Sequence, residues 1–256
     1  MFSITQIQSN ISKLTNTFPV RVVILGSGWN KILETLTVEA EISYSDLFDV
    51  TASVPGHEGR LVIAQVNGKR VAFMSGRFHL YEGYSAYEAT LPIRIFAQLG
   101  MKELVLTSAS GAINEKYKVG DFMVLSDIIT LFLKDNPLKG PEFIDMSEVF
   151  DQTLREKAMK TCIENAIPFH EGIYCFTHGP HFETPADKMT LKIIGSDVVG
   201  MSTVPETIMA RALGVKVLGL SFITNLAFVK HEHKDVLAEA NKASSQMTTL
   251  LEGILK

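Results

Sequence analysis

Apolar segments of strand length alternate with helical patterns along the chain, and this alternation constrains the fold more than any other feature. Residues 4–14 and 236–255 carry hydrophobic side chains at the spacing of an amphipathic helix, and 20–25, 103–107 and 215–223 are apolar runs typical of buried strands. Strands that alternate with helices form sheets covered on both faces. We therefore expect an α/β fold in which residues 1–256 form one domain, with a mixed central β-sheet flanked by helices.

The segment from Ser85 to Gly100 carries the signals of a complete helix. Ser85 and Glu88 have the spacing of a capping box, in which each side chain bonds the backbone of the other residue. Gly100 supplies the end of the helix. Pro92 lies inside this range, and we expect a kink there because proline removes one helical hydrogen bond.

Ser202 stands directly before a second predicted helix. Thr203 and Glu206 have capping-box spacing, Pro205 fits the first turn, and the helix is expected to end near Gly214. The positive end of the helix dipole would favour an anion at Ser202. The alternative is that Ser202 or Thr203 only caps the helix.

Composition and charge narrow the class of protein. The chain has 256 residues, of which 46% are hydrophobic and 20% charged, as in globular proteins. Its formal net charge of -4, without a cluster of lysine and arginine, disfavours nucleic acid as a partner. Cys162 and Cys175 form no disulfide framework, which suits a reducing compartment. No basic leader or bilayer-length apolar segment is present, so we expect a cytoplasmic protein with no membrane contact.

Residues 76–84 read Gly-Arg-Phe-His-Leu-Tyr-Glu-Gly-Tyr and follow an apolar run. If the backbone stays extended past Gly76, Arg77, His79 and Tyr81 point to the same side. A guanidinium, an imidazole and a phenol in one row could bind a phosphate and the sugar beside it. The alternative is an exposed strand end with scattered polar residues.

The first strand ends in Gly26-Ser27-Gly28, which invites comparison with a dinucleotide-binding turn. Lys31 stands where the third glycine of that fingerprint belongs, so we reject that interpretation. The amides of the turn and the Ser27 hydroxyl could still hold a phosphate. An ordinary turn between a strand and a helix explains the pattern equally well.

Two further segments could recognise a flat base. Phe182 and Glu183 lie in a proline-bounded loop, where a base could stack on the ring while the carboxylate accepts a hydrogen bond. Asn225 closes the strand 219–225, at the position where α/β proteins bind ligands, and a carboxamide both donates and accepts. Alternatively Phe182 belongs to the core, Glu183 starts a helix and Asn225 is a turn residue.

The histidines do not predict a metal site. The cluster 231–233 and the pair His178 and His181 match no standard zinc spacing and have no cysteine beside them. His57 lies in a glycine-containing loop and is either a surface residue or a group beside the phosphate.

Together these segments closely resemble the trimeric, low-molecular-mass class of purine nucleoside phosphorylases, a family that also includes methylthioadenosine phosphorylase. The matching motifs stand in family order between residues 20 and 240: 25–28, 54–57, 76–84, 107–111, 179–184, 200–206 and 223–225. The resemblance implies the nucleoside phosphorylase fold, a homotrimer, and pentosyl transfer from a purine nucleoside to phosphate in purine salvage. Phosphate is then a co-substrate, and no cofactor is implied.

The resemblance also implies a role for individual residues. The expected phosphate ligands are Ser27, Arg77, His79, the amide of Ala109 and Ser202, with His57 close by. The expected nucleoside contacts are Tyr81 and Met201 at the sugar, His233 at the 5′-hydroxyl, Tyr174 beside sugar and base, and Phe182, Glu183 and Asn225 at the base. Phe143 would be a lid supplied by a neighbouring subunit. Asn225, Glu183 and His79 are the expected catalytic residues.

Two alternatives share this fold. Methylthioadenosine phosphorylase needs an acidic residue where this chain has Asn225, because a 6-amino purine presents a donor at that position. Asn225 therefore favours inosine and guanosine, including their 2′-deoxy analogues. A non-catalytic nucleoside-binding protein would lack part of the phosphate set, whereas Arg77, His79 and Ser202 are all present.

Overall fold

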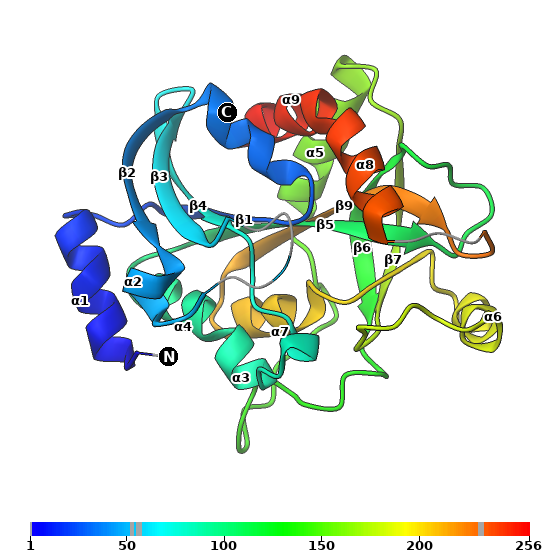
Figure 1. Ribbon diagram of the computed structural model, residues 1–256, viewed down its shortest axis with the longest axis horizontal. Helices are drawn as coiled ribbons and strands as arrows, with labels where there is room; N and C mark the ends of the chain where they lie inside the picture. Colours follow the sequence, from blue (N-terminus) through cyan, green and yellow to red (C-terminus); the bar gives the residue numbers. More distant parts are fainter. Residues whose placement is uncertain (1, 52–53, 55–57, 230–232) are drawn as a thin grey trace.

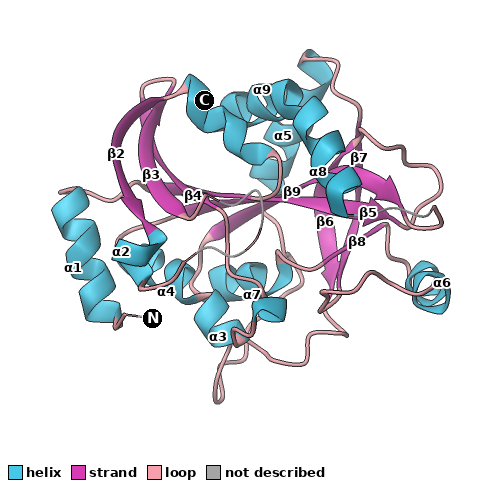
Figure 2. Cartoon of the chain, in the orientation of Figure 1, coloured by secondary structure: helices cyan, strands magenta, loops and turns pink. Residues whose placement is uncertain are grey.

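The fold is built around a mixed β-sheet that is covered by helices on both faces. The computed structural model describes residues 2–51, 54, 58–229 and 233–256, and for 233–237 only the backbone. The strands of the described part are β1 (Arg21–Leu25), β2 (Thr37–Ser43), β3 (Arg60–Val66), β4 (Lys69–Ser75), β5 (Glu103–Ala112), β6 (Phe122–Ile129), β7 (Phe169–Phe176), β8 (Val198–Gly200) and β9 (Lys216–Leu226). The sheet order is β2-β3-β4-β1-β5-β8-β7-β6-β9, and β9 pairs additionally with β5 (Figure 2).

This second pairing of β9 closes part of the sheet on itself. Five strands, β5, β8, β7, β6 and β9, form a ring in which every strand has two neighbours. The remaining strands β1 to β4 extend the sheet from β5. Strand β1 runs parallel to β4 and to β5, and β5 runs parallel to β9. The carboxyl ends of these four strands therefore meet at one edge.

Two hydrophobic clusters occupy the two faces of the sheet. Along β1, Val22 and Ile24 contribute to one cluster while Val23 and Leu25 contribute to the other, which is the alternation expected of a strand buried on both sides. The helices flanking the sheet are α1 (Ile4–Leu14), α2 (Tyr44–Phe48), α3 (Ala86–Ala89), α4 (Leu91–Gln98), α5 (Gln152–Glu164), α6 (Pro185–Ile193), α7 (Val204–Ala212), α8 (His233–Lys242) and α9 (Ser244–Leu255). Helices α5, α8 and α9 cover one face and α1 to α4 and α7 the other, while α6 stands to one side (Figure 1).

The structure confirms the predicted α/β fold with a mixed sheet and most of the predicted elements. The Ser85–Glu88 capping box forms as expected. The expected kink at Pro92 is a full break, because α3 ends at Ala89 and Pro92 lies in the first turn of α4. The predicted helix over 236–255 is likewise two helices, α8 and α9, which meet at Ala243. Within the described residues no helix has both the length and the apolar character needed to cross a bilayer.

The condition for a row of Arg77, His79 and Tyr81, an extended backbone past Gly76, is met only in part. Strand β4 ends at Ser75, and Gly76 has a φ of 106°, a conformation that favours glycine. Residues Leu80–Glu82 then form a short 3-10 helix. The chain therefore turns at Gly76, is extended at His79 and turns again over Leu80–Glu82.

The predicted capping box of α7 is also wrong. Thr203 precedes α7 with a φ of 71° and makes no side-chain cap, although Pro205 lies in the first turn as expected. Glu206 is 4% exposed and pairs with a residue from a different part of the chain. Thr203 and Glu206 therefore have the spacing of a capping box without forming one, and Glu206 forms an ion pair instead.

Candidate active site

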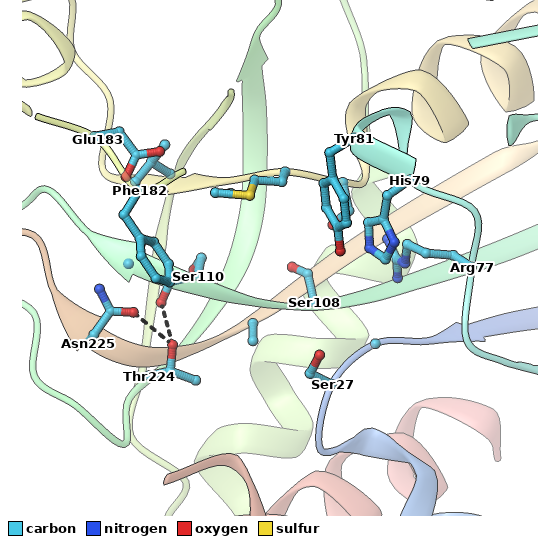
Figure 3. Close-up of a pocket in the computed structure, with 17 residues that line it drawn as sticks. Ser27, Arg77, His79, Tyr81, Ser108, Ser110, Phe182, Glu183, Thr224 and Asn225 are labelled. Atoms are coloured by element: carbon cyan, nitrogen blue, oxygen red, sulfur yellow. Dashed lines mark hydrogen bonds between the residues drawn. The ribbon is translucent and has the colours of Figure 1, made fainter. Parts of the chain in front are cut away.

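A cavity opens at the edge where the carboxyl ends of β1, β4, β5 and β9 meet. Its wall includes Ser27 after β1, Arg77 after β4, Ala109 on β5 and Asn225 on β9. Side chains that follow parallel strands converge at such an edge, which is where α/β proteins bind ligands. Figure 3 shows Arg77, His79, Tyr81 and Ser27 toward one end of the cavity and Phe182, Glu183 and Asn225 toward the other.

The turn after β1 is packed closely against β5. The Gly26 amide donates a hydrogen bond to the Thr107 hydroxyl at 2.9 Å, and the Trp29 indole N–H donates to the Ser108 carbonyl at 3.1 Å. A Cβ at position 26 would lie 2.6 Å from the Thr107 carbonyl oxygen. Only glycine therefore lets the turn approach β5 and place Ser27 on the cavity wall.

Arg77 is a buried cation held from several sides. Its NH1 group lies 3.2 Å from Glu206 Oε1 and 3.4 Å from Thr203 Oγ1, and NH2 donates to the Thr107 carbonyl. The Arg77 and Glu206 side chains are only 3% and 5% exposed. The Thr203 hydroxyl also lies 3.2 Å from Ser202 Oγ, so the two wall residues Arg77 and Ser202 are connected through Thr203.

His79 is oriented by Glu82. One oxygen of the Glu82 carboxylate accepts from the His79 backbone N–H at 2.8 Å and lies 3.0 Å from the ring Nδ1. The ring also stacks on Tyr81, with centroids 4.6 Å apart. Burial lowers the pKa of His79 below its usual value, although the hydrogen bond that the ring donates to Glu82 opposes this shift. Because a carboxylate can only accept, Nδ1 carries the proton, and Nε2 of the neutral ring is an acceptor.

At the other end of the cavity, the carboxamide of Asn225 is held in place by β5 and β9. The Thr224 hydroxyl lies 3.0 Å from Asn225 Oδ1 and 3.2 Å from the Ser110 carbonyl, and its one proton is shared between these two acceptors. A Cβ at Gly111 would lie 2.8 Å from Asn225 Nδ2, so the glycine leaves room for the amide. The bond to Oδ1 identifies Nδ2 as the donor side of the carboxamide.

Phe182 and Glu183 lie on the loop that leads into α6. The Glu183 carboxylate accepts a hydrogen bond from the Thr177 hydroxyl at 2.8 Å. The Phe182 ring is 39% exposed, and Figure 3 places it next to Asn225. An aromatic face, a carboxylate and a carboxamide therefore line the same end of the cavity.

Comparisons with known proteins agree with this geometry. The sequence profile described as the phosphorylase superfamily matches residues 20–256. Curated relatives include the purine nucleoside phosphorylase of Bos taurus, 41% identical over 91% of this chain and 86% of its own length, and purine nucleoside phosphorylase 1 of Geobacillus stearothermophilus, 38% identical over 94% and 92%. The chain belongs to the purine nucleoside phosphorylase family of this superfamily.

Solved structures of the family share the whole fold. The Schistosoma purine nucleoside phosphorylase in complex with hypoxanthine superposes with a TM-score of 0.90 at 34% identity, covering 98% of this chain and 95% of that one. The Schistosoma mansoni enzyme in complex with inosine gives a TM-score of 0.89 with the same identity and coverage.

Ten of the residues singled out in the sequence line this one cavity. They are Ser27, Arg77, His79, Tyr81, Ala109, Phe182, Glu183, Met201, Ser202 and Asn225. Arg77, His79 and Tyr81 reach one wall although strand β4 ends before them, because the turn at Gly76 and the 3-10 helix after His79 bring them together.

Tyr174 does not line the cavity, in contrast to its expected position beside sugar and base. The side chain is fully buried, and its hydroxyl accepts a hydrogen bond from the Ser202 amide at 3.4 Å. A Cβ at Gly200 would lie 2.2 Å from this hydroxyl. Tyr174 thus packs behind the wall and supports Ser202. Burial raises the pKa of its phenol.

Three other expected residues lie outside this cavity or outside the described part of the chain. His57 is not among the described residues, and of His233 the structure describes only the backbone, at the start of α8. Phe143 is 94% exposed in the loop between β6 and α5, where it lines a groove separate from the cavity. The described residues contain no group of three or more His, Cys, Asp or Glu side chains able to hold a metal.

Four residues that hold the wall in place were not predicted as part of the site from the sequence. Glu82, Glu206, Thr224 and Thr177 each bond a residue of the cavity wall. Glu82 had a usable signal, because its spacing from His79 is that of a capping box. For Glu206 the same spacing from Thr203 predicted the wrong partner.

Proposed function

We propose that this chain catalyses the reversible phosphorolysis of purine nucleosides, chiefly inosine, guanosine and their 2′-deoxy analogues. The products are the free base and ribose 1-phosphate or its deoxy analogue, as required in purine salvage. The observation that carries the proposal is one cavity with an anion-binding end and a base-binding end. Ser27, Arg77, His79, the Ala109 amide and Ser202 hold phosphate, while Phe182, Glu183 and Asn225 hold the purine.

The reaction needs alignment and electrostatic stabilisation more than it needs a protein nucleophile. Cleavage of an N-glycosidic bond builds positive charge on the sugar and negative charge on the departing base. Phosphate bound beside Arg77 and His79 attacks the sugar and counters its charge. Tyr81 and Met201 also line the cavity and contact the sugar. Fixed binding of both reactants supplies much of the rate enhancement.

His79 and Asn225 act at opposite ends of the reacting bond. The His79 ring accepts a hydrogen bond at Nε2 from the P–OH group of hydrogen phosphate, so that an unprotonated oxygen faces the sugar. Asn225 donates from Nδ2 to the acceptor edge of a 6-oxopurine, and Glu183 accepts from the N1–H group of the same base. A 6-amino purine offers neither match, which disfavours methylthioadenosine phosphorylase activity.

The first prediction is that cleavage of inosine depends on phosphate. We expect hypoxanthine release in phosphate buffer and essentially none in phosphate-free buffer, with activity unchanged by a metal chelator. An assay coupled to hypoxanthine oxidation measures both. Equal rates without phosphate would indicate a hydrolase, and loss of activity on chelation would contradict the proposed roles of the protein side chains.

We further propose a homotrimer in which Phe143 covers the nucleoside bound by a neighbouring subunit. Phe143 is 94% exposed, the most exposed large apolar side chain in the described part of the chain. A trimer in the cytoplasm fits the two free, buried cysteines, which need no oxidising compartment.

Phe143→Ala is therefore expected to raise KM for inosine about five- to tenfold, because the nucleoside loses a few contacts with the partly buried ring. The Tm should stay unchanged. Ile163→Ala is the matched control, because Ile163 is 70% exposed on α5 and remote from the loop. Light scattering gives the mass of the assembly. A fully active monomer, or equal KM values for both variants, would contradict the lid.

A further inference from the structure

The charge of the phosphate-binding end is unusual for a site that takes a dianion. Among the described residues that line the cavity, Arg77 is the only lysine or arginine. Burial lowers the pKa of His79 and so disfavours its charged form. Glu183 lies at the opposite, base-binding end (Figure 3). Arg77 is thus the positive charge that this end of the wall supplies to phosphate.

That positive charge is already paired inside the protein. Glu206 Oε1 lies 3.2 Å from Arg77 NH1, and with 3% and 5% exposure the two side chains are screened very little by water. Glu206 is the third residue of α7, where a glutamate ordinarily bonds back to the start of its own helix. Here that local contact is absent: Thr203, the residue before α7, has a φ of 71°, and no side-chain hydrogen bond caps the helix.

The field of Glu206 also reaches the cavity. Its carboxylate raises the pKa of His79, partly offsetting the larger lowering caused by burial and the effect of Arg77. A charge that acts on His79 acts on an anion bound beside the same ring.

We propose that Glu206 sets the phosphate affinity of the site: by pairing with Arg77 it keeps the phosphate subsite near neutrality, so that phosphate is held by fixed hydrogen-bond donors and not by excess positive charge. This inference rests on the proposed function and identifies a residue, outside the cavity wall, that determines affinity for oxyanions. Phosphate then binds weakly enough to react as a nucleophile and to be exchanged.

If Glu206 sets phosphate affinity, removal of its charge should lower KM for phosphate. Loss of a purely structural contact would not lower it. Glu206→Gln keeps the size of the side chain and an acceptor oxygen but removes the negative charge. Phosphate then meets an Arg77 guanidinium whose charge Glu206 no longer offsets, so KM for phosphate should fall about tenfold or more, since one unit charge at an effective dielectric of about 20 is worth at least that much. We expect kcat to fall as well, because the added binding is present in the ground state.

The experiment compares wild type, Glu206→Gln, Glu206→Asp and Glu103→Gln. KM for phosphate and for inosine are measured separately, together with the rise in Tm that phosphate and sulfate cause. Glu103 is the matched control, because it also forms an ion pair with an arginine, Arg21, at 2.5 Å. Both residues begin their strands, β5 and β1, at the end away from the cavity. We expect tighter phosphate and sulfate binding in Glu206→Gln alone, with KM for inosine changed less than threefold. Glu206→Asp, which retains the charge, should remain close to wild type.

An unchanged or raised KM for phosphate in Glu206→Gln would overturn the proposal, as would the same change in Glu103→Gln. If Glu206→Gln does not fold alone, refolding with and without phosphate replaces the kinetic test. Recovery that depends on phosphate supports the proposal, and equal failure in both buffers overturns it. Absence of phosphate-dependent activity in the wild type would instead refute the proposed function, and the Tm measurements still report phosphate binding in that case.

Discussion

Asn225→Asp is expected to lower kcat/KM for inosine by about 2 to 4 kcal/mol in free-energy terms, roughly 30- to 1000-fold. The substitution replaces the Nδ2 donor by a carboxylate oxygen of the same shape. That oxygen faces the O6 acceptor of hypoxanthine, so one hydrogen bond is lost and a repulsive contact replaces it. The Thr224 hydroxyl continues to hold Oδ1, which keeps the new carboxylate in place.

The same variant should gain activity on adenosine, whose 6-amino group donates to a carboxylate. We expect the gain to be smaller than the loss on inosine, because Glu183 still requires a protonated N1 that neutral adenine lacks. Both nucleosides are assayed at saturating phosphate. Asn136→Asp is the control, since Asn136 lies exposed in a loop and its Oδ1 already serves as an acceptor for the Leu138 amide at 2.9 Å. Wild-type kcat/KM for inosine together with no activity on adenosine would show that Asn225 does not face the base.

Much of the fold could be predicted because its signals are local. The helix over 4–14 and the first strand follow from hydrophobic spacing, and the Ser85–Glu88 capping box needs only neighbouring residues. The predicted ends of strands and helices were wrong where the chain turns without a clear signal in the neighbouring residues. Gly76 ends β4 through a positive φ that the period-two pattern does not reveal, and the break at Ala243 divides one apolar periodicity into α8 and α9.

The residues of the cavity wall could be found because each stands at the end of a recognisable strand or in a compact loop. Their supports could not, because they depend on contacts across the sheet. Glu206 pairs with Arg77 across 129 positions, and nothing within α7 shows that its carboxylate leaves the helix. Tyr174 lies behind Ser202 and not beside sugar and base, and this position follows from the approach of β7 and β8.

Arg77→Met is expected to have the largest effect on stability. It leaves the Glu206 carboxylate at 4% exposure without its ion-pair partner, and breaking a buried pair from one side lowers the free energy of unfolding by about 3 to 5 kcal/mol. Phosphate binding should weaken about 10- to 150-fold as well, since one charge-assisted hydrogen bond is worth about 1.5 to 3 kcal/mol. This shift is opposite in sign to the one expected for Glu206→Gln.

The double variant Arg77→Met/Glu206→Gln separates the two effects. With both charges removed, no ion is left unpaired, so most of the lost free energy of unfolding should return. KM for phosphate should remain high, because the guanidinium is still absent. Urea denaturation measures the free energy of unfolding, and steady-state kinetics give KM for phosphate.

Arg21→Met is the control: it breaks a pair whose side chains are 16% and 26% exposed, so a loss of about 1 kcal/mol or less in the free energy of unfolding is expected. If Arg77→Met lost no more than this control, or if the double variant were no more stable than the single one, the buried pair would not hold this part of the site together.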